Sequence, residues 1–89
     1  MLYVYTLRCK DKWTYIGCTN NLKDRLQRHN NSHIEATKNR IPVKLISYFA
    51  FNSESIAFNF EKYLKSGSGR AFLRKHVIIS QPKFEINTM

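Results

Sequence analysis

Two strand-like runs separated by three polar residues constrain the fold of this chain most strongly. Residues 2–9 are apolar, β-branched or aromatic on both alternating faces, which is typical of a strand at the centre of a sheet. Residues 13–18 predict a second strand. Lys10-Asp11-Lys12 between them is a common length for a hairpin loop, so the two runs are expected to pair antiparallel.

The length of this loop determines which side chains share a face of the hairpin. Because side chains alternate along a strand, only a loop with an odd number of residues places Tyr5 and Tyr15 on the same face. A three-residue loop sets Tyr5 opposite Gly17, with Tyr15 diagonally across. Glycine at such a position leaves room for a ligand or a backbone to approach closely. The alternative is that both tyrosines are ordinary strand residues.

Helix and strand signals alternate through the middle of the chain. Thr19 or Asn20 can cap a helix that runs to about His29. Residues 30–41 are polar and basic and predict a loop. A third strand is expected over residues 43–51, directly after a proline, which a strand tolerates only at its start or at an edge.

Two further helices are predicted nearer the carboxyl end. Asn52 and Ser53 can cap a long helix that reaches Lys65. The Ser-Gly-Ser-Gly run at residues 66–69 ends it, and a shorter helix follows over residues 70–77. The order β-β-α-β-α-α predicts an α+β fold, with a small three-stranded antiparallel sheet flanked by helices.

Length and charge limit the class of protein. The 89 residues suit one domain, expected over residues 1–80, with a loose tail over residues 81–89. The net charge of +9 favours a polyanionic partner, most often nucleic acid, although a basic surface without a dedicated partner is the alternative. Cys9 and Cys18 make no disulfide scaffold. Neither a signal peptide nor a bilayer-spanning run is found, so we expect no membrane association and a cytoplasmic location.

The first predicted helix carries two polar residues on its apolar stripe. Leu22, Arg25, Leu26 and His29 follow the spacing i, i+3, i+4, i+7 and share one side of the helix. The two leucines must face the sheet, so Arg25 and His29 are expected at the edge of the buried face. A charge there costs free energy unless it is paired or serves a site.

Glu61 interrupts the apolar stripe of the second long helix in a similar way. It shares its side of that helix with apolar residues, among them Ala57 and Leu64. Glu61 therefore either serves a functional site or forms a structural ion pair with Arg25 or Lys65. The pattern alone does not separate these alternatives.

Together, these features resemble the GIY-YIG nuclease superfamily over residues 3–76. The chain looks like the small single-domain members and is similar to the amino-terminal nuclease module found in bacterial excision nucleases. Each short motif has low specificity, while their order and spacing together are more specific. The matching elements are Tyr3-Val4-Tyr5, Tyr15-Ile16-Gly17, Asn20-Asn21-Leu22, Arg25, His29, Pro42-Val43-Lys44-Leu45 and Glu61.

The resemblance implies a metal-dependent DNA endonuclease that hydrolyses phosphodiester bonds, in repair or recombination. Glu61 would hold one Mg²⁺ or Mn²⁺ ion, since a single carboxylate with waters and phosphate oxygens is a usual magnesium arrangement. Tyr15 would activate the attacking water, and Arg25 would stabilise a phenolate or the transition-state phosphate. Tyr5 would hydrogen-bond within the site, and His29 would position or transfer a proton.

Three departures from the family pattern bear on catalysis. Tyr3 replaces the glycine of the first motif, as in many small members. Cys18 stands where some relatives carry a lysine, which removes one phosphate contact; the cysteine itself is expected to be a half-buried filler rather than a reactive thiol. The asparagine that some relatives carry on the last helix has no clear counterpart.

The nuclease interpretation requires Tyr5, Tyr15, Arg25 and Glu61 to meet on one concave surface, with Tyr15 and Glu61 on the same side of the sheet. The alternatives are a catalytically weak or inactive nucleic-acid-binding module of the same fold, an RNA-binding protein of ribosomal type, and an accessory protein that needs a partner for activity. The candidate contacts to DNA phosphates are Lys23, Arg28, Lys38, Arg40, Lys65 and Arg70.

Overall fold

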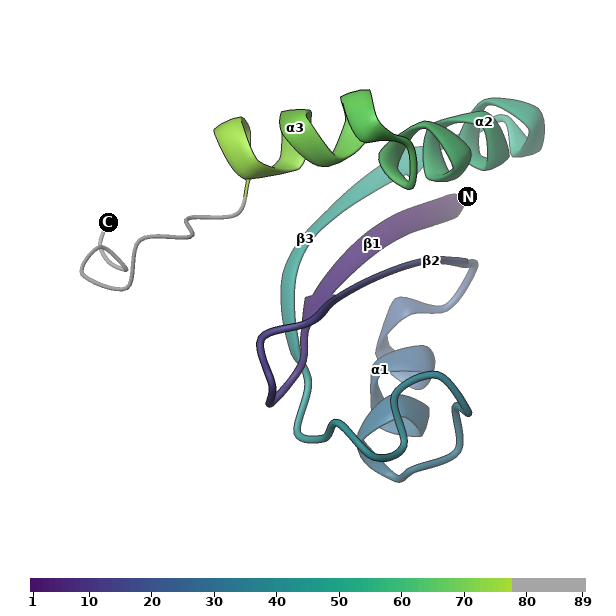
Figure 1. Cartoon of the computed structure of the whole chain (residues 1–89). Helices are drawn as coiled ribbons and strands as arrows, with labels where there is room; N and C mark the ends of the chain where they lie inside the picture. Colours follow the sequence, from purple (N-terminus) through teal and green to yellow (C-terminus); the bar gives the residue numbers. More distant parts are fainter. Residues whose placement is uncertain (78–89) are drawn as a thin grey trace.

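Three strands and three helices follow the predicted order. The computed structural model describes residues 1–77, so the expected domain end at residue 80 and the expected tail over 81–89 lie outside the described residues. Within residues 1–77, no helix has the length and apolar character needed to cross a membrane. The α+β prediction is confirmed (Figure 1), with the elements β1 (Leu2–Arg8), β2 (Thr14–Thr19), α1 (Leu22–Asn30), β3 (Lys44–Phe51), α2 (Glu54–Leu64) and α3 (Gly67–His76).

β1 is the central strand of the sheet, as its apolar character on both faces predicted. The strand order is β2-β1-β3, and both pairs are antiparallel. Figure 1 shows a curved sheet with α1 on one side and with α2 and α3 on the other. Because helices cover both faces, the central strand is buried on both sides.

The hairpin between β1 and β2 has the predicted register. The Cys9 backbone N–H donates to the Trp13 carbonyl oxygen at 2.8 Å, which encloses a loop of three residues. Lys12 in this loop has φ of 72°, the left-handed conformation that three-residue hairpin loops use. Tyr5 faces Gly17, and Tyr15 lies two pairs further along, opposite Leu7. The prediction that the two tyrosines share a face is therefore confirmed.

The two faces of the sheet bury separate apolar clusters. On the α1 side, Tyr5 and Leu7 are buried, and the half-buried Leu22 and Leu26 of α1 pack against them. This arrangement confirms that the leucine stripe docks α1 on the sheet. The cluster on the other side consists of Val4 and Ile16 from the strands with Ala57, Leu64 and Leu73 from α2 and α3.

The cap of α1 lies later than the sequence indicated. The helix begins after Asn21, whose side-chain oxygen accepts a hydrogen bond from the Asp24 backbone N–H at 3.1 Å. Thr19, one of the two expected caps, instead accepts the Asn21 backbone N–H at 3.1 Å. The prediction that Thr19 or Asn20 caps the helix is therefore wrong. The Thr19 hydroxyl is hydrogen-bonded within the turn that precedes the helix. At α2 the prediction of Ser53 is confirmed.

The Ser-Gly-Ser-Gly run belongs to α3 and is not merely a break before it. Ser66 caps this helix, and its hydroxyl accepts the Gly69 backbone N–H at 3.2 Å. Gly69 packs so tightly on the end of α2 that an added Cβ would collide with the Tyr63 carbonyl oxygen. The expected start at Arg70 is therefore wrong, because α3 begins at Gly67 and Gly69 permits a close contact between the two helices.

Candidate active site

A hydrogen-bonded chain of three side chains is buried between the sheet and α1. Tyr5 is 1% exposed, and His29 and Thr37 are fully buried. The Tyr5 hydroxyl lies 3.1 Å from His29 Nε2, and His29 Nδ1 lies 2.7 Å from the Thr37 hydroxyl. Each ring nitrogen thus has one partner, which fixes the orientation of the imidazole. The centre of β1, the last turn of α1 and the loop after α1 are joined at this point.

Tyr15 completes an aromatic cluster with Tyr5 and His29. Its ring centroid lies 4.9 Å from that of His29, at an interplanar angle of 65°, and 6.1 Å from that of Tyr5. Such edge-to-face contacts are favourable for aromatic pairs. Tyr15 is only half-buried, whereas the other two rings are buried. Tyr15 is therefore the phenol of this cluster that reaches the surface.

Gly17 provides the space that this cluster needs. A Cβ at this position would lie 2.6 Å from the Tyr5 hydroxyl oxygen and 2.9 Å from a ring carbon of Tyr15. The φ angle of Gly17 is not positive, so the requirement concerns space and not backbone conformation. The sequence expectation that a glycine opposite Tyr5 permits close approach holds, although the approaching groups are side chains of the chain itself.

We expect Gly17→Ala to lower the free energy of unfolding by about 1–3 kcal/mol, since both tyrosine rings must shift. Urea denaturation followed by circular dichroism measures this loss. Gly67→Ala is the matched control, because no atom lies within 4 Å of a Cβ there and the site is in the first turn of a helix. Equal stability of both variants and the wild type would contradict the packing described for Gly17.

Charges from two helices act on the Tyr5 hydroxyl. Burial raises the pKa of Tyr5 well above its ordinary value, and the neighbouring Tyr15 raises it further. The Arg25 guanidinium lowers the pKa of Tyr5 and the Glu61 carboxylate raises it, by smaller amounts. Tyr5 therefore stays protonated at neutral pH and can only donate or accept a hydrogen bond. Arg25 and Glu61 both lie near enough to influence it.

The helix that carries Glu61 packs on the opposite face of the sheet from Tyr15. Tyr15 packs with the cluster beneath α1, whereas Ala57 and Leu64 of α2 pack with the cluster on the other face. The expectation that Tyr15 and Glu61 share one face stays a prediction, because the apolar clusters place the two helices and not the end of the Glu61 side chain. Glu61 raises the pKa of Tyr5 and also that of Cys18, which neighbours Gly17 in β2, so its carboxylate lies close to this edge strand.

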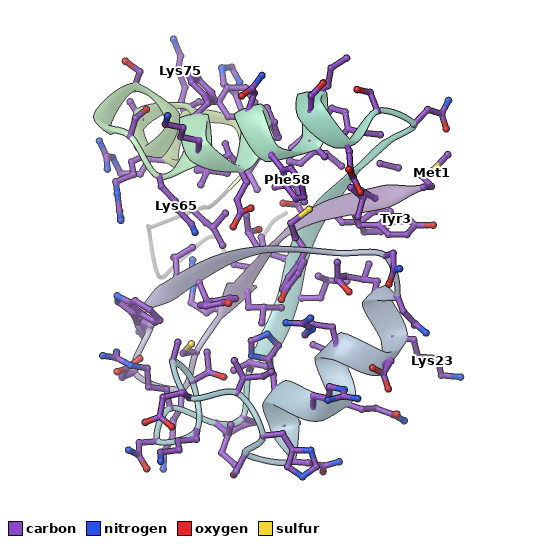
Figure 2. The ribbon with its side chains drawn as sticks, turned by 90° about the vertical axis from the view of Figure 1, so that its right-hand side faces the viewer. Met1, Tyr3, Lys23, Phe58, Lys65 and Lys75 are labelled. Atoms are coloured by element: carbon purple, nitrogen blue, oxygen red, sulfur yellow. The ribbon has the colours of Figure 1, made fainter. Side chains whose placement is uncertain are left out.

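A cavity of about 220 Å³, here called the Tyr15 cavity, opens at this edge strand. The Glu61 carboxylate holds the Lys65 ammonium at 3.0 Å, which is one of the structural ion pairs that the sequence left open. Figure 2 shows Lys65 between the helical layer and β2. Tyr15 and the partner of Glu61 thus meet at one cavity, which is lined by Trp13, Thr14, Tyr15, Ile16, Lys65 and Arg70.

His29 is held in its neutral form. Burial lowers the pKa of its imidazole below the ordinary value, and the nearby Arg25 guanidinium lowers it further. A neutral ring has one donor and one acceptor nitrogen, which matches its two hydroxyl partners. The ring is fully buried between its hydroxyl partners and exposes no surface to a substrate.

The lowered pKa of His29 predicts a pH dependence of stability. The unfolded chain protonates this histidine near pH 6.5, whereas the folded protein does so only at lower pH. Stability is therefore expected to fall as pH drops below about 6.5, because the unfolded state then binds more protons. Unfolding free energies between pH 5 and 7.5 for the wild type and His29→Gln test this. The variant should show a shallower slope, and an unchanged slope would contradict the assignment.

Cys18 is a half-buried side chain that packs against the core on the α2 side. Burial raises the pKa of its thiol above the ordinary value, and the Glu61 and Glu54 carboxylates raise it further. A raised pKa disfavours the reactive thiolate. These observations support the interpretation of Cys18 as a filler.

The six basic residues predicted to contact phosphates lie in different places. Lys65 and Arg70 line the Tyr15 cavity, whereas Lys23 lies on α1, away from it (Figure 2). Arg40 also stacks on the Trp13 ring, 4.3 Å from its centroid. Four of the six engage nearby carboxylates, in the pairs Arg28–Asp24, Lys38–Glu35, Arg40–Asp11 and Lys65–Glu61. Pairs this exposed are weak and can be exchanged for phosphates.

Sequence reasoning missed Thr37 and Arg8. Thr37 lies in the loop after α1, where no periodic pattern marks a buried residue, so the sequence carried no signal for it. Arg8 did carry one, because it is a charge on the alternating face of β1 that Val4 and Thr6 share. Its Nε atom is buried.

The Glu61 carboxylate is suited to hold one divalent cation. Within residues 1–77, no three His, Cys, Asp or Glu side chains gather where an ion could bind. Glu61 offers hard carboxylate oxygens on a side chain that is 22% exposed, and Lys65 engages one of them. A single carboxylate of this kind suits Mg²⁺ when waters and phosphate oxygens complete the coordination.

Comparison with known proteins gives one consistent family. The sequence profile of the GIY-YIG catalytic domain matches residues 1–75. The chain is 44% identical over 66 residues to the UPF0213 protein CPE1444 of Clostridium perfringens, covering 73% of this chain and 71% of that protein. It is 39% identical over 70 residues to the UPF0213 protein SpyM50708 of Streptococcus pyogenes, covering 78% and 76%.

A solved structure agrees with these sequence matches. The solution NMR structure of the UPF0213 protein BH0048 from Bacillus halodurans superimposes with a TM-score of 0.54 at 32% identity, covering 84% of each chain. This chain belongs to the GIY-YIG family, a nuclease superfamily, and resembles its small UPF0213 members.

Proposed function

We propose that this protein is a metal-dependent endonuclease that cleaves DNA at the Tyr15 cavity. One observation carries the proposal: the buried chain Tyr5–His29–Thr37 holds the half-exposed Tyr15 ring at a cavity with two cations, within a GIY-YIG domain. A catalytic site requires an accessible polar group that is held rigidly by buried neighbours. A hydrophobic core has no such requirement.

Tyr15 is the residue that acts on the attacking water. Its hydroxyl orients the water, or its phenolate form takes a proton from the water and returns to the neutral phenol as the hydroxide attacks the phosphorus; nearby positive charge stabilises that phenolate. Lys65 and Arg70 line the same cavity and supply that charge. Arg25, on the α1 side, stabilises the charge that develops on the scissile phosphate.

Tyr5 and His29 are positioning residues in this proposal. Tyr5 stays protonated because its pKa is raised by burial, and it donates or accepts hydrogen bonds only. His29 is buried and neutral, so it locks both tyrosine rings. A role of His29 in proton transfer to the substrate is not supported by this burial.

Glu61 would hold the divalent cation, Mg²⁺ or Mn²⁺. When bound, such an ion supplies Lewis-acid stabilisation of phosphate charge. Glu61 must exchange its Lys65 partner for the ion, and Lys65 is then available to a phosphate. This exchange would couple ion binding to DNA binding at the cavity.

The second candidate is a nucleic-acid-binding module of the same fold with little or no catalysis. The pairing of Glu61 with Lys65 and the presence of Cys18 in place of a lysine favour it. Both candidates predict binding that weakens steeply with salt, since phosphate contacts release counterions. Only the nuclease requires the cation.

Cleavage of labelled nucleic acids tests the proposal. The panel contains duplex, nicked, branched and single-stranded DNA and a structured RNA, each with Mg²⁺, Mn²⁺ or EDTA. The nuclease is expected to cut at least one DNA with the cation and none with EDTA. Tight binding without any cleavage would favour the binding module, and preference for the RNA would favour an RNA-binding protein.

A further inference from the structure

A second cavity, of about 290 Å³, lies between the β1–β2 hairpin and α3. Four cations surround it and two apolar side chains form part of its wall. We call it the cationic cleft and define it by Arg8, Lys12, Arg70, Arg74, Ile16 and Leu73. It lies on the α2–α3 side of the sheet, away from the Tyr5–His29–Thr37 chain.

The charges of the cationic cleft are not neutralised by described residues. None of the ion pairs within residues 1–77 involves any of its four cations, and no carboxylate lines it. The Arg8 Nε atom is buried without a hydrogen-bond partner among the described residues. A buried guanidinium N–H without a partner is costly, and an anion bound in the cleft would remove that cost.

The chemistry of the walls indicates a phosphate attached to a less polar group. Arginines bind phosphate through parallel N–H donors, and three of the four cations are arginines. Ile16 and Leu73 offer apolar surface to a sugar or a base. A volume near the lower limit of small-molecule sites suits one nucleotide unit.

The cationic cleft adjoins the Tyr15 cavity. Thr14, Ile16 and Arg70 line both. The geometry points to a second nucleotide site, in which the cationic cleft binds a phosphate of the same strand whose scissile phosphate lies at Tyr15. This inference rests on the proposed function for its ligand, and it assigns Arg8, Arg70 and Arg74 as the residues that hold the strand beyond the point of cleavage.

Arg74→Gln and Lys75→Gln form a matched pair of variants. Both residues are exposed in the last turn of α3 and each variant removes one positive charge, but only Arg74 lines the cleft. Figure 2 shows Lys75 on the side of the helical layer turned away from the sheet. A general loss of charge would affect the two variants equally.

The test is an NMR titration of the ¹⁵N-labelled full chain in EDTA. The probes are the thymidine dinucleotide TpT, its 5′-phosphorylated form and inorganic phosphate. We expect saturable amide shifts around Arg8, Thr14 and Leu73. The dissociation constant should rise about fivefold or more in Arg74→Gln, as for loss of one charge-assisted contact, and less than about twofold in Lys75→Gln.

Each outcome of the titration shows whether the cationic cleft binds a phosphate. Shifts produced by TpT assign the cleft to an internal phosphodiester, and shifts produced only by the phosphorylated dinucleotide and phosphate assign it to a strand end. Shifts spread evenly over the surface, or equal effects of the two variants, would overturn the inference. The titration involves no cleavage, so it is independent of catalysis. If the protein cleaves DNA but shows no such shifts, only phosphate binding in the cationic cleft is refuted. If it shows the shifts but does not cleave DNA, only the proposed catalysis is refuted.

Discussion

Replacement of Glu61 with glutamine is expected to abolish metal-dependent cleavage and to leave DNA binding intact. Glutamine keeps the size of the side chain but removes the charge that an ion requires. We expect the single-turnover rate to fall by about 10³-fold or more, which corresponds to about 4 kcal/mol of transition-state stabilisation. Cleavage in Mg²⁺ and fluorescence anisotropy of DNA binding in EDTA measure the two properties separately.

Glu54→Gln is the control for this change. Glu54 lies in the first turn of the same helix, is exposed and forms no ion pair within residues 1–77. Its replacement removes the same charge, and the cleavage rate should change by less than about twofold. If Glu61→Gln retained the wild-type rate, Glu61 would be only the structural partner of Lys65.

Tyr15→Phe is expected to lower the cleavage rate by about 10²- to 10⁴-fold, the range of a lost general acid or base. The ring contact with His29 at 4.9 Å needs no hydroxyl, so the fold and DNA binding should remain. Single-turnover cleavage rates and DNA-binding constants, measured on the same variant, separate a loss of chemistry from altered binding.

Tyr48→Phe provides the comparison for Tyr15→Phe. Tyr48 is 54% exposed on β3, opposite Tyr5, and lies outside the Tyr15 cavity. The two variants remove the same group from the same sheet. A Tyr15→Phe protein as active as Tyr48→Phe would show that Tyr15 only packs the site.

The hairpin could be predicted in detail because its information is local. Alternation along residues 2–9 and a loop of odd length fixed the register, which in turn placed Gly17 against Tyr5. The docking face of α1 followed from Leu22 and Leu26 for the same reason, since helical spacing is visible in the sequence. Such signals need no knowledge of distant residues.

The arrangement of the site could not be predicted, because it depends on which helix covers which face. The apolar stripes of α1 and α2 indicate that both helices pack on the sheet. They do not indicate which face of the sheet each helix covers. In the structure α2 lies on the face opposite α1, which the apolar stripes alone did not reveal. The burial of Thr37 against His29 depends on the path of a loop, which has no periodic pattern.

Net charge indicated a nucleic-acid partner without locating the contacts. Four of the six residues chosen from the sequence engage carboxylates on the surface. Arg8 and Arg74, which line the cationic cleft, come together only when α3 packs across the hairpin. Ion pairs and the closeness of Arg8 to Arg74 depend on the tertiary structure, so the composition does not reveal them.

The most direct test of the central claim is the single-turnover cleavage of labelled branched and duplex DNA by the wild-type protein as Mg²⁺ or Mn²⁺ is titrated. We expect the cleavage rate to rise and saturate as the cation is added. EDTA should abolish the cleavage, and the Glu61→Gln protein should show no such cation-dependent rate. DNA that is bound by the protein but stays intact at every cation concentration, across the whole panel, would contradict the central claim.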